Sequence, residues 1–179
     1  MTVQIPSAGP LLTVTRPVVD DVSVRLTAAA VLTVVVLAAV TGQWWLYGVL
    51  AVDFALRAAG RRTLSPLGAL THHVARPRLR VAPRPTSAAP KRFAAGIGAV
   101  LTAAAFAVWL GQVVLTSAPG SGAVVVSPVV WGITVVMIAF PTLEAAFGLC
   151  VGCKVYALLI RLGVLPADAC VDCAPSVRR

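Results

Sequence analysis

Four long apolar runs, separated by polar or basic stretches, constrain this chain more than any other feature. We expect spans at about residues 24–41, 44–60, 93–115 and 129–149. A helix needs about 20 mostly apolar residues to cross the hydrocarbon core of a bilayer. Backbone polar groups find no partners in lipid, so each span is expected to be helical. The sequence therefore predicts an all-α integral membrane four-helix bundle with the lipid bilayer as its main partner.

The composition agrees with a lipid environment. Hydrophobic residues make up 59% of the chain and charged residues 12%, whereas soluble domains average about 45–50% and about 25%. The net charge of +9 is compatible with nucleic-acid binding or with basic cytoplasmic loops. No zinc-finger spacing, aromatic RNA-binding motif or basic helix is present in the sequence, so we expect no nucleic-acid partner.

The position of the charges predicts an orientation. The 15 Lys and Arg residues lie before or at the start of the first run, from the end of the second run to the start of the third, or after the fourth. Cytoplasmic loops of membrane proteins carry such an excess of Lys and Arg. All four tryptophans fall near the opposite ends of the runs, as expected of an aromatic belt at an interface. We therefore predict a multi-pass protein of the cell inner (plasma) membrane with both termini cytoplasmic.

The organisation around the spans follows from these assignments. We expect a flexible N-terminal tail at residues 1–20, a membrane domain at 21–163 and a Cys-containing C-terminal tail at 164–179. The membrane domain includes a basic cytoplasmic loop at 61–92 and ends in a short helix at 154–163.

Smaller features suggest local structure. Ser65 and Pro66 suit the start of an interfacial helix, whose apolar residues would face the bilayer: Leu67, Leu70 and Val74. His72 and His73 are adjacent, so a solvated or headgroup-facing pair is expected rather than a metal site. A row of small residues along the third run either forms a ridge for close helix packing or simply reflects the abundance of Ala throughout the chain; it consists of Ala95, Ala99, Ala103 and Ala107.

All four cysteines lie in the last thirty residues, as the pairs Cys150/Cys153 and Cys170/Cys173 in the pattern C-x2-C-x16-C-x2-C. Thiol chemistry is one interpretation, since two cysteines at this spacing form an easily reduced disulfide. In that case Gly152 interrupts the fourth helix, and a new helix from Lys154 directs its N-terminus and the Lys154 charge at Cys153. All four cysteines together also fit a zinc site. The remaining alternative is apolar packing.

Two carboxylates lie within the apolar runs, where acids are rare and often functional. Asp53 is expected to form a structural ion pair with Arg57, four residues later on the same helical face. Glu144 lies six residues before Cys150. It is expected to pair with Arg57 or Arg92, or to accept a proton from a thiol.

Several segments together resemble a known family. They include Asp53-Phe54-Ala55-Leu56-Arg57, Arg92-Phe93-Ala94-Ala95-Gly96 and the stretch L-E-x-x-F-G-x-C-x-G-C-x-x-Y from Leu143 to Tyr156. The sequence resembles the domain of unknown function DUF4395, a bacterial membrane family, over about residues 20–165. This resemblance implies a small four-helix membrane protein and no established activity. Cys170 and Cys173 lie beyond the matched part.

The leading functional hypothesis is a membrane partner in thiol–disulfide or sulfur-relay chemistry. Cys150 and Cys153 would be the reacting residues, with Glu144 as proton acceptor and a thioredoxin-like or sulfurtransferase protein as partner. One alternative is a non-enzymatic scaffold with zinc held by Cys150, Cys153, Cys170 and Cys173. Another is a small-solute transporter, for which four spans per chain would favour a homo-oligomer. Whether the protein is an enzyme stays open at this point.

Overall fold

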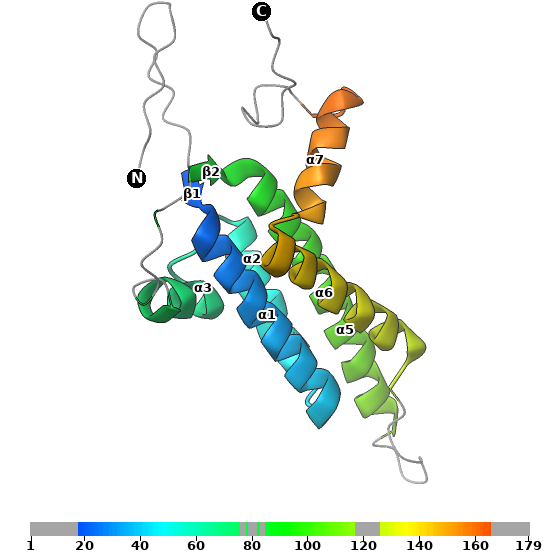
Figure 1. The fold of residues 1–179 in the computed structure, drawn as a ribbon. Coiled ribbons are helices and arrows are strands. Elements are labelled where there is room, and N and C mark those ends of the chain that lie inside the picture. The colour runs from blue at the N-terminus through cyan, green and yellow to red at the C-terminus, as the bar shows by residue number, and fades with distance from the viewer. Residues whose placement is uncertain (1–17, 76–77, 79–81, 83–84, 117–125, 166–179) are drawn as a thin grey trace, which may run out of the picture.

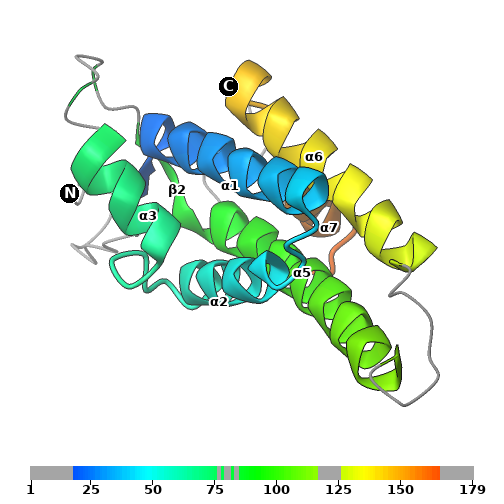
Figure 2. The same cartoon turned by 90° about the horizontal axis from the view of Figure 1, so that it is seen from below.

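The computed structural model describes residues 18–75, 78, 82, 85–116 and 126–165. Three long helices form its frame: α1 (Asp21–Thr41), α5 (Ala88–Thr116) and α6 (Pro128–Phe147). Each is long and apolar enough to cross a membrane. They lie side by side, α1 and α5 running one way and α6 the other (Figures 1 and 2). The all-α class is confirmed, with three candidate spans in the part of the chain described.

The second predicted span, 44–60, is shorter than expected. Helix α2 covers Leu46–Ala58, only 13 residues, or about 20 Å at 1.5 Å per residue. Trp44 and Trp45 form a turn after the left-handed Gly42 rather than the first turn of the helix. Helix α2 is therefore too short to count among the candidate spans, although it packs closely against α5.

The close approach of α2 to α5 depends on a glycine. A Cβ atom at Gly98 would lie 2.7 Å from the Phe54 ring of α2. The face of α5 turned toward the core consists of Ala95, Gly98, Thr102 and Ala105. The alanine ridge predicted from the sequence is therefore wrong in its second half, because Ala103 and Ala107 are exposed.

The core is apolar and continues to the far end of the bundle, where aromatic rings meet. The Trp44 and Trp131 rings contact edge to face at 5.2 Å between centroids. The Tyr47 hydroxyl and the Thr134 hydroxyl, both buried, share a hydrogen bond of 2.7 Å that links α2 to α6. These two polar groups, which enter the apolar core, therefore satisfy each other.

Short elements gather at the opposite end (Figure 1). Strands β1 (Val18–Asp20) and β2 (Pro85–Ser87) pair antiparallel, with Val19 opposite Thr86. Helix α3 (Pro66–Leu70) continues into the π-helical turn η1 (Thr71–Ala75), and α7 (Val151–Arg161) follows α6. Residues 18–20, assigned to the tail from the sequence, thus form β1.

The predicted start of the interfacial helix is confirmed. Ser65 accepts a hydrogen bond from the Gly68 N–H at 3.0 Å, and Pro66 occupies the first turn. Leu70 and Val74 are exposed, as expected, but Leu67 packs against the core instead.

Candidate functional site

The candidate site begins at the break between α6 and α7. Gly148 is left-handed (φ 69°) and ends α6, with its N–H donating to the Glu144 carbonyl at 3.0 Å. Cys150 is the N-cap of α7, and its sulfur accepts a hydrogen bond from the Cys153 N–H at 3.4 Å. The interruption therefore lies at Gly148 and not at Gly152, and the last helix begins at Val151 rather than at residue 154. Both cysteines are free thiols at the start of α7.

Gly152 has a packing role instead. A Cβ atom there would clash with the Cβ of Ala94 on α5 and would lie 2.8 Å from the Ala94 Cα. The absent side chain lets α7 dock directly on the start of α5. Nearby, the Tyr156 ring is buried against the Phe93 ring, 5.4 Å between centroids. The glycine between the two cysteines thus fixes their distance from the residues of α5.

Lys91, on the first turns of α5, is the cation beside the cysteines. Its ammonium lies 2.9 Å from a Glu144 oxygen and 3.4 Å from an Asp21 oxygen, and its side chain is 8% exposed. The predicted partners of Glu144, Arg57 and Arg92, are therefore wrong. Arg57 is held by Asp53 on its own helix. Sequence reasoning placed Lys91 in the basic loop and missed its role, because a partner 53 positions away gives no local signal.

Other arginines close helix ends. The Arg92 Nε donates to the Ala58 carbonyl at the end of α2 at 2.9 Å. The Arg25 guanidinium donates to the Ala145 and Ala146 carbonyls at the end of α6, at 2.9 to 3.2 Å. A cation at a helix C-terminus satisfies carbonyls that lack intrahelical partners. These contacts hold the ends of α2 and α6 in place around the site.

The two thiols differ in exposure and acidity. Cys150 is buried, 7% exposed, and Cys153 is partly exposed. The hydrogen bond between the two side chains raises the pKa of Cys150, and burial raises that pKa further. The same hydrogen bond lowers the pKa of Cys153, and the Lys91 ammonium lowers it too. These directions make Cys153 the more acidic thiol of the pair. Lys91 supplies the charge that was expected of Lys154, which is exposed.

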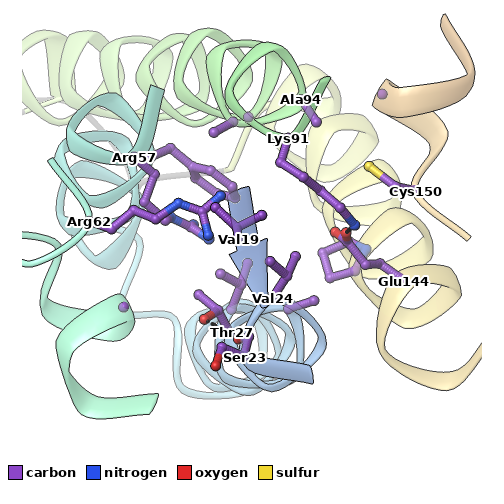
Figure 3. Close-up of a pocket in the computed structure, with 18 of the residues that line it drawn as sticks. Val19, Ser23, Val24, Thr27, Arg57, Arg62, Lys91, Ala94, Glu144 and Cys150 are labelled. Atoms are coloured by element: carbon purple, nitrogen blue, oxygen red, sulfur yellow. Dashed lines mark hydrogen bonds and ion pairs between the residues drawn. The ribbon is translucent and has the colours of Figure 1, made fainter. Parts of the chain in front are cut away.

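A cavity of about 1160 Å³ adjoins this pair. Figure 3 shows Lys91 reaching from α5 toward Glu144 on α6, with the Cys150 sulfur beside them and Arg57 and Arg62 on the opposite wall. The rest of the lining is mainly apolar and comes largely from α1, α5 and α6. Cys150 thus lies on the wall of a cavity that has both charged and apolar sides.

The predicted Asp53–Arg57 pair is confirmed. Asp53 is fully buried, and its Oδ2 lies 2.8 Å from Arg57 Nη2. Its other oxygen accepts hydrogen bonds from the Ser65 hydroxyl at 2.5 Å and the Leu67 N–H at 3.0 Å. The Arg57 guanidinium also lies over the Phe54 ring, 4.2 Å from its centroid. Asp53 therefore ties α3 to α2.

The zinc alternative falls partly outside the described residues, because Cys170 and Cys173 lie beyond residue 165. Within the part of the chain that the structure describes, no group of three or more His, Cys, Asp or Glu side chains could hold a metal ion. The His72 and His73 rings contact each other edge to face, and both residues are exposed, as predicted.

Comparison with known proteins identifies the family. Residues 19–161 match the family described as domain of unknown function (DUF4395), so the chain belongs to it and the resemblance is confirmed. No curated protein and no solved structure matches. The family match covers Cys150, Cys153, Lys91 and Glu144, and it assigns no activity to them.

Proposed function

We propose that the chain is a thiol–disulfide or sulfur-relay protein of the cell inner membrane, with Cys150 and Cys153 as its reacting pair. The observation that supports this most directly is the position of the pair at the start of α7. Cys150 is the N-cap, and the charge of the buried Lys91 ammonium lowers the pKa of the more exposed Cys153. A helix N-terminus and a nearby cation both favour a thiolate, which is the reactive form of cysteine.

The exchange step follows from the exposure of the two sulfurs. The Cys153 thiolate attacks a disulfide sulfur of the partner, whose S–S bond breaks as a mixed disulfide forms. The Cys150 thiol then gives its proton to the released partner thiolate, and its sulfur attacks Cys153. The partner's second sulfur leaves as a thiolate that takes a proton from water, so the partner becomes a dithiol and a Cys150–Cys153 disulfide remains. Two electrons have passed to the partner, and a second dithiol protein restores the pair by the reverse reaction.

Glu144 has a supporting role in this reaction. It holds Lys91 in place at 2.9 Å, and its negative charge opposes thiolate formation at Cys153. If Glu144 accepts the Cys150 proton, as considered from the sequence, that proton passes to a residue that lines the cavity. Lys91 therefore lowers the pKa of Cys153, and Glu144 raises it.

The membrane arrangement belongs to the same proposal. Helices α1, α5 and α6 would span the bilayer, with α2 as a short fourth member of the bundle. The basic residues of the described chain cluster at the end that carries β1, α3 and α7 (Figure 1). Because Lys and Arg are retained on the cytoplasmic side, this end and both termini are assigned to the cytoplasm. The cysteine pair is then open to cytoplasmic partners such as a thioredoxin-like protein or a sulfurtransferase.

The test uses full-length protein in membrane vesicles, with Cys170→Ser and Cys173→Ser present so that only one pair remains. A thioredoxin that lacks its resolving cysteine, supplied with its remaining thiol activated as a mixed disulfide, is the probe. We expect the Cys150→Ser variant to accumulate a mixed disulfide through Cys153, and the Cys153→Ser variant to form little. A membrane-impermeant maleimide should label Cys153 only from the cytoplasmic face.

Two results would reject the proposal. One is equal mixed-disulfide formation by the two single variants. The other is a pair that stays reduced when oxidised thioredoxin or diamide is added. Stoichiometric zinc in purified unmodified protein, lost together with protease resistance of the tail on chelation, would favour the scaffold alternative instead.

A further inference from the structure

One arginine in the cavity forms no direct ion pair within the described residues. Arg62 follows α2, is partly buried and lines the cavity. Its guanidinium forms no ion pair or side-chain hydrogen bond with any residue in the described ranges, whereas Arg57 is paired with Asp53 and Lys91 with Glu144. Burial and the neighbouring Arg57 charge both lower the pKa of Arg62. A partly buried charge next to a like charge is unfavourable unless an anion joins them.

Arg57 adds a second unsatisfied group. Its buried Nε has no hydrogen-bond partner among the described residues, although Nη2 lies against Asp53. Figure 3 shows both arginine side chains on the same wall of the cavity, with Arg62 extending toward Val19. Two guanidinium groups on one wall suit a carboxylate or a phosphate, which Arg binds through two parallel hydrogen bonds.

The cavity also has an apolar length that a small inorganic ion would not fill. Its lining runs along α1 from Ser23 to Val31, which is about 12 Å at 1.5 Å per residue. The apolar part includes Phe54, Leu101, Met137 and Phe140. A ligand that matches both regions has an anionic head and an apolar body.

We propose that this cavity binds an anionic amphiphile from the membrane, with its head group held by Arg62 and Arg57 and its chain lying between α1, α5 and α6. Charge and shape alone support this site, which does not depend on the thiol chemistry. Cys150 lies on the opposite wall of the same cavity.

The test measures ligand binding to full-length protein purified in an uncharged detergent, by native mass spectrometry and by thermal shift. The probes are lysophosphatidylglycerol, lysophosphatidylcholine with the same chain, and inorganic phosphate. We expect the anionic lipid to bind and to raise the unfolding midpoint. The zwitterionic lipid should bind about tenfold more weakly or worse, as expected for the loss of one charge-assisted contact. Phosphate should have no effect at millimolar concentration.

The decisive variant is Arg62→Gln, with Arg61→Gln as its matched control. Arg61 is adjacent, is exposed and lies outside the cavity lining, so both variants lose one positive charge from the same loop. Losing one charge-assisted contact should weaken lysophosphatidylglycerol binding about tenfold in Arg62→Gln, and the control should change less than twofold. Arg62→Lys keeps the positive charge but loses the guanidinium group that can form two parallel hydrogen bonds. Its affinity for lysophosphatidylglycerol should lie between those of Arg61→Gln and Arg62→Gln.

Three results would overturn the inference. Equal loss in the Arg61 and Arg62 variants would mean that the lipid responds only to net charge. Equal binding of the two lysolipids would mean that the site does not recognise the negative charge of the head group. Phosphate binding as tight as that of the anionic lipid would exclude an amphiphile as the ligand. Because no thiol reaction is measured, these outcomes are independent of the redox test.

Discussion

The contact between Gly152 and Ala94 provides a sharp test of how α7 is positioned. In a Gly152→Ala variant the new Cβ would lie 2.8 Å from the Ala94 Cα. Carbon atoms pack best at about 3.5–4.0 Å, so α7 must move away from α5 by about 1 Å. Overpacking of this kind costs about 1–3 kcal/mol. Alanine is favoured over glycine inside a helix by about 0.5–1 kcal/mol.

The net effect should therefore be a loss of about 1–2 kcal/mol of unfolding free energy, which lowers the thermal midpoint by several degrees. Gly96→Ala on α5 is the matched control, since nothing lies within 4 Å of its new Cβ. That control should be neutral or slightly stabilising. Thermal unfolding in detergent measures both variants. The alkylation rate of Cys150, 7% exposed in the native protein, should also rise in Gly152→Ala alone.

A double variant tests whether the contact with Ala94 causes the loss. Ala94→Gly removes the atom that the new side chain would meet, so Ala94→Gly with Gly152→Ala should be less destabilised than the sum of the single variants. We expect a coupling of about 1 kcal/mol or more between the two positions. Strict additivity, or a Gly152→Ala variant as stable as Gly96→Ala, would refute close packing as the reason for this glycine.

Three further predictions concern the charges around the site. The alkylation rate of Cys153 should have a pH midpoint below the ordinary thiol pKa of about 8.5. Lys91→Gln should raise that midpoint and Glu144→Gln should lower it, because the lysine lowers the Cys153 pKa and the glutamate raises it. Lys91→Met should destabilise the fold by about 3 kcal/mol, because it leaves Glu144 partly buried without its cation, and Lys91→Met with Glu144→Leu should recover most of that loss in thermal unfolding. Ser65→Ala should cost about 1–2 kcal/mol, since Ser65 both caps α3 and donates to the buried Asp53; a Thr63→Ala control at an exposed position should change little.

The sequence was informative where a signal is local. Apolar runs of sufficient length located α1, α5 and α6, the spacing of Asp53 and Arg57 predicted their ion pair, and Ser65-Pro66 marked the start of α3. In each case the interacting groups lie within a few turns of one helix. Periodicity and capping preferences therefore suffice to find them.

The prediction failed where geometry depends on distant contacts. Lys91 lies at the edge of a basic loop, and nothing in its neighbours indicates that it reaches Glu144, 53 residues away. Gly152 was interpreted as a helix breaker, but its role depends on the close approach of Ala94. The length of α2 was overestimated because Trp44 and Trp45 are apolar enough to extend a span, yet they form a turn. Composition alone does not separate a helical tryptophan from one in a turn.

The charges at this end of the bundle divide into two groups with different consequences. Lys91 lies between two acids, Glu144 and Asp21, so it has little positive charge left for a ligand. It acts on the cysteine pair, where its charge lowers the pKa of Cys153. Arg62 has no such acid beside it within the described residues, and the acid that attracts it, Glu144, is already bound to Lys91. An anion in the cavity is therefore expected to bind Arg62 and Arg57, while Lys91 stays paired with Glu144 and Asp21. Substitution of Arg62 should then weaken ligand binding, and substitution of Lys91 should raise the pKa of Cys153.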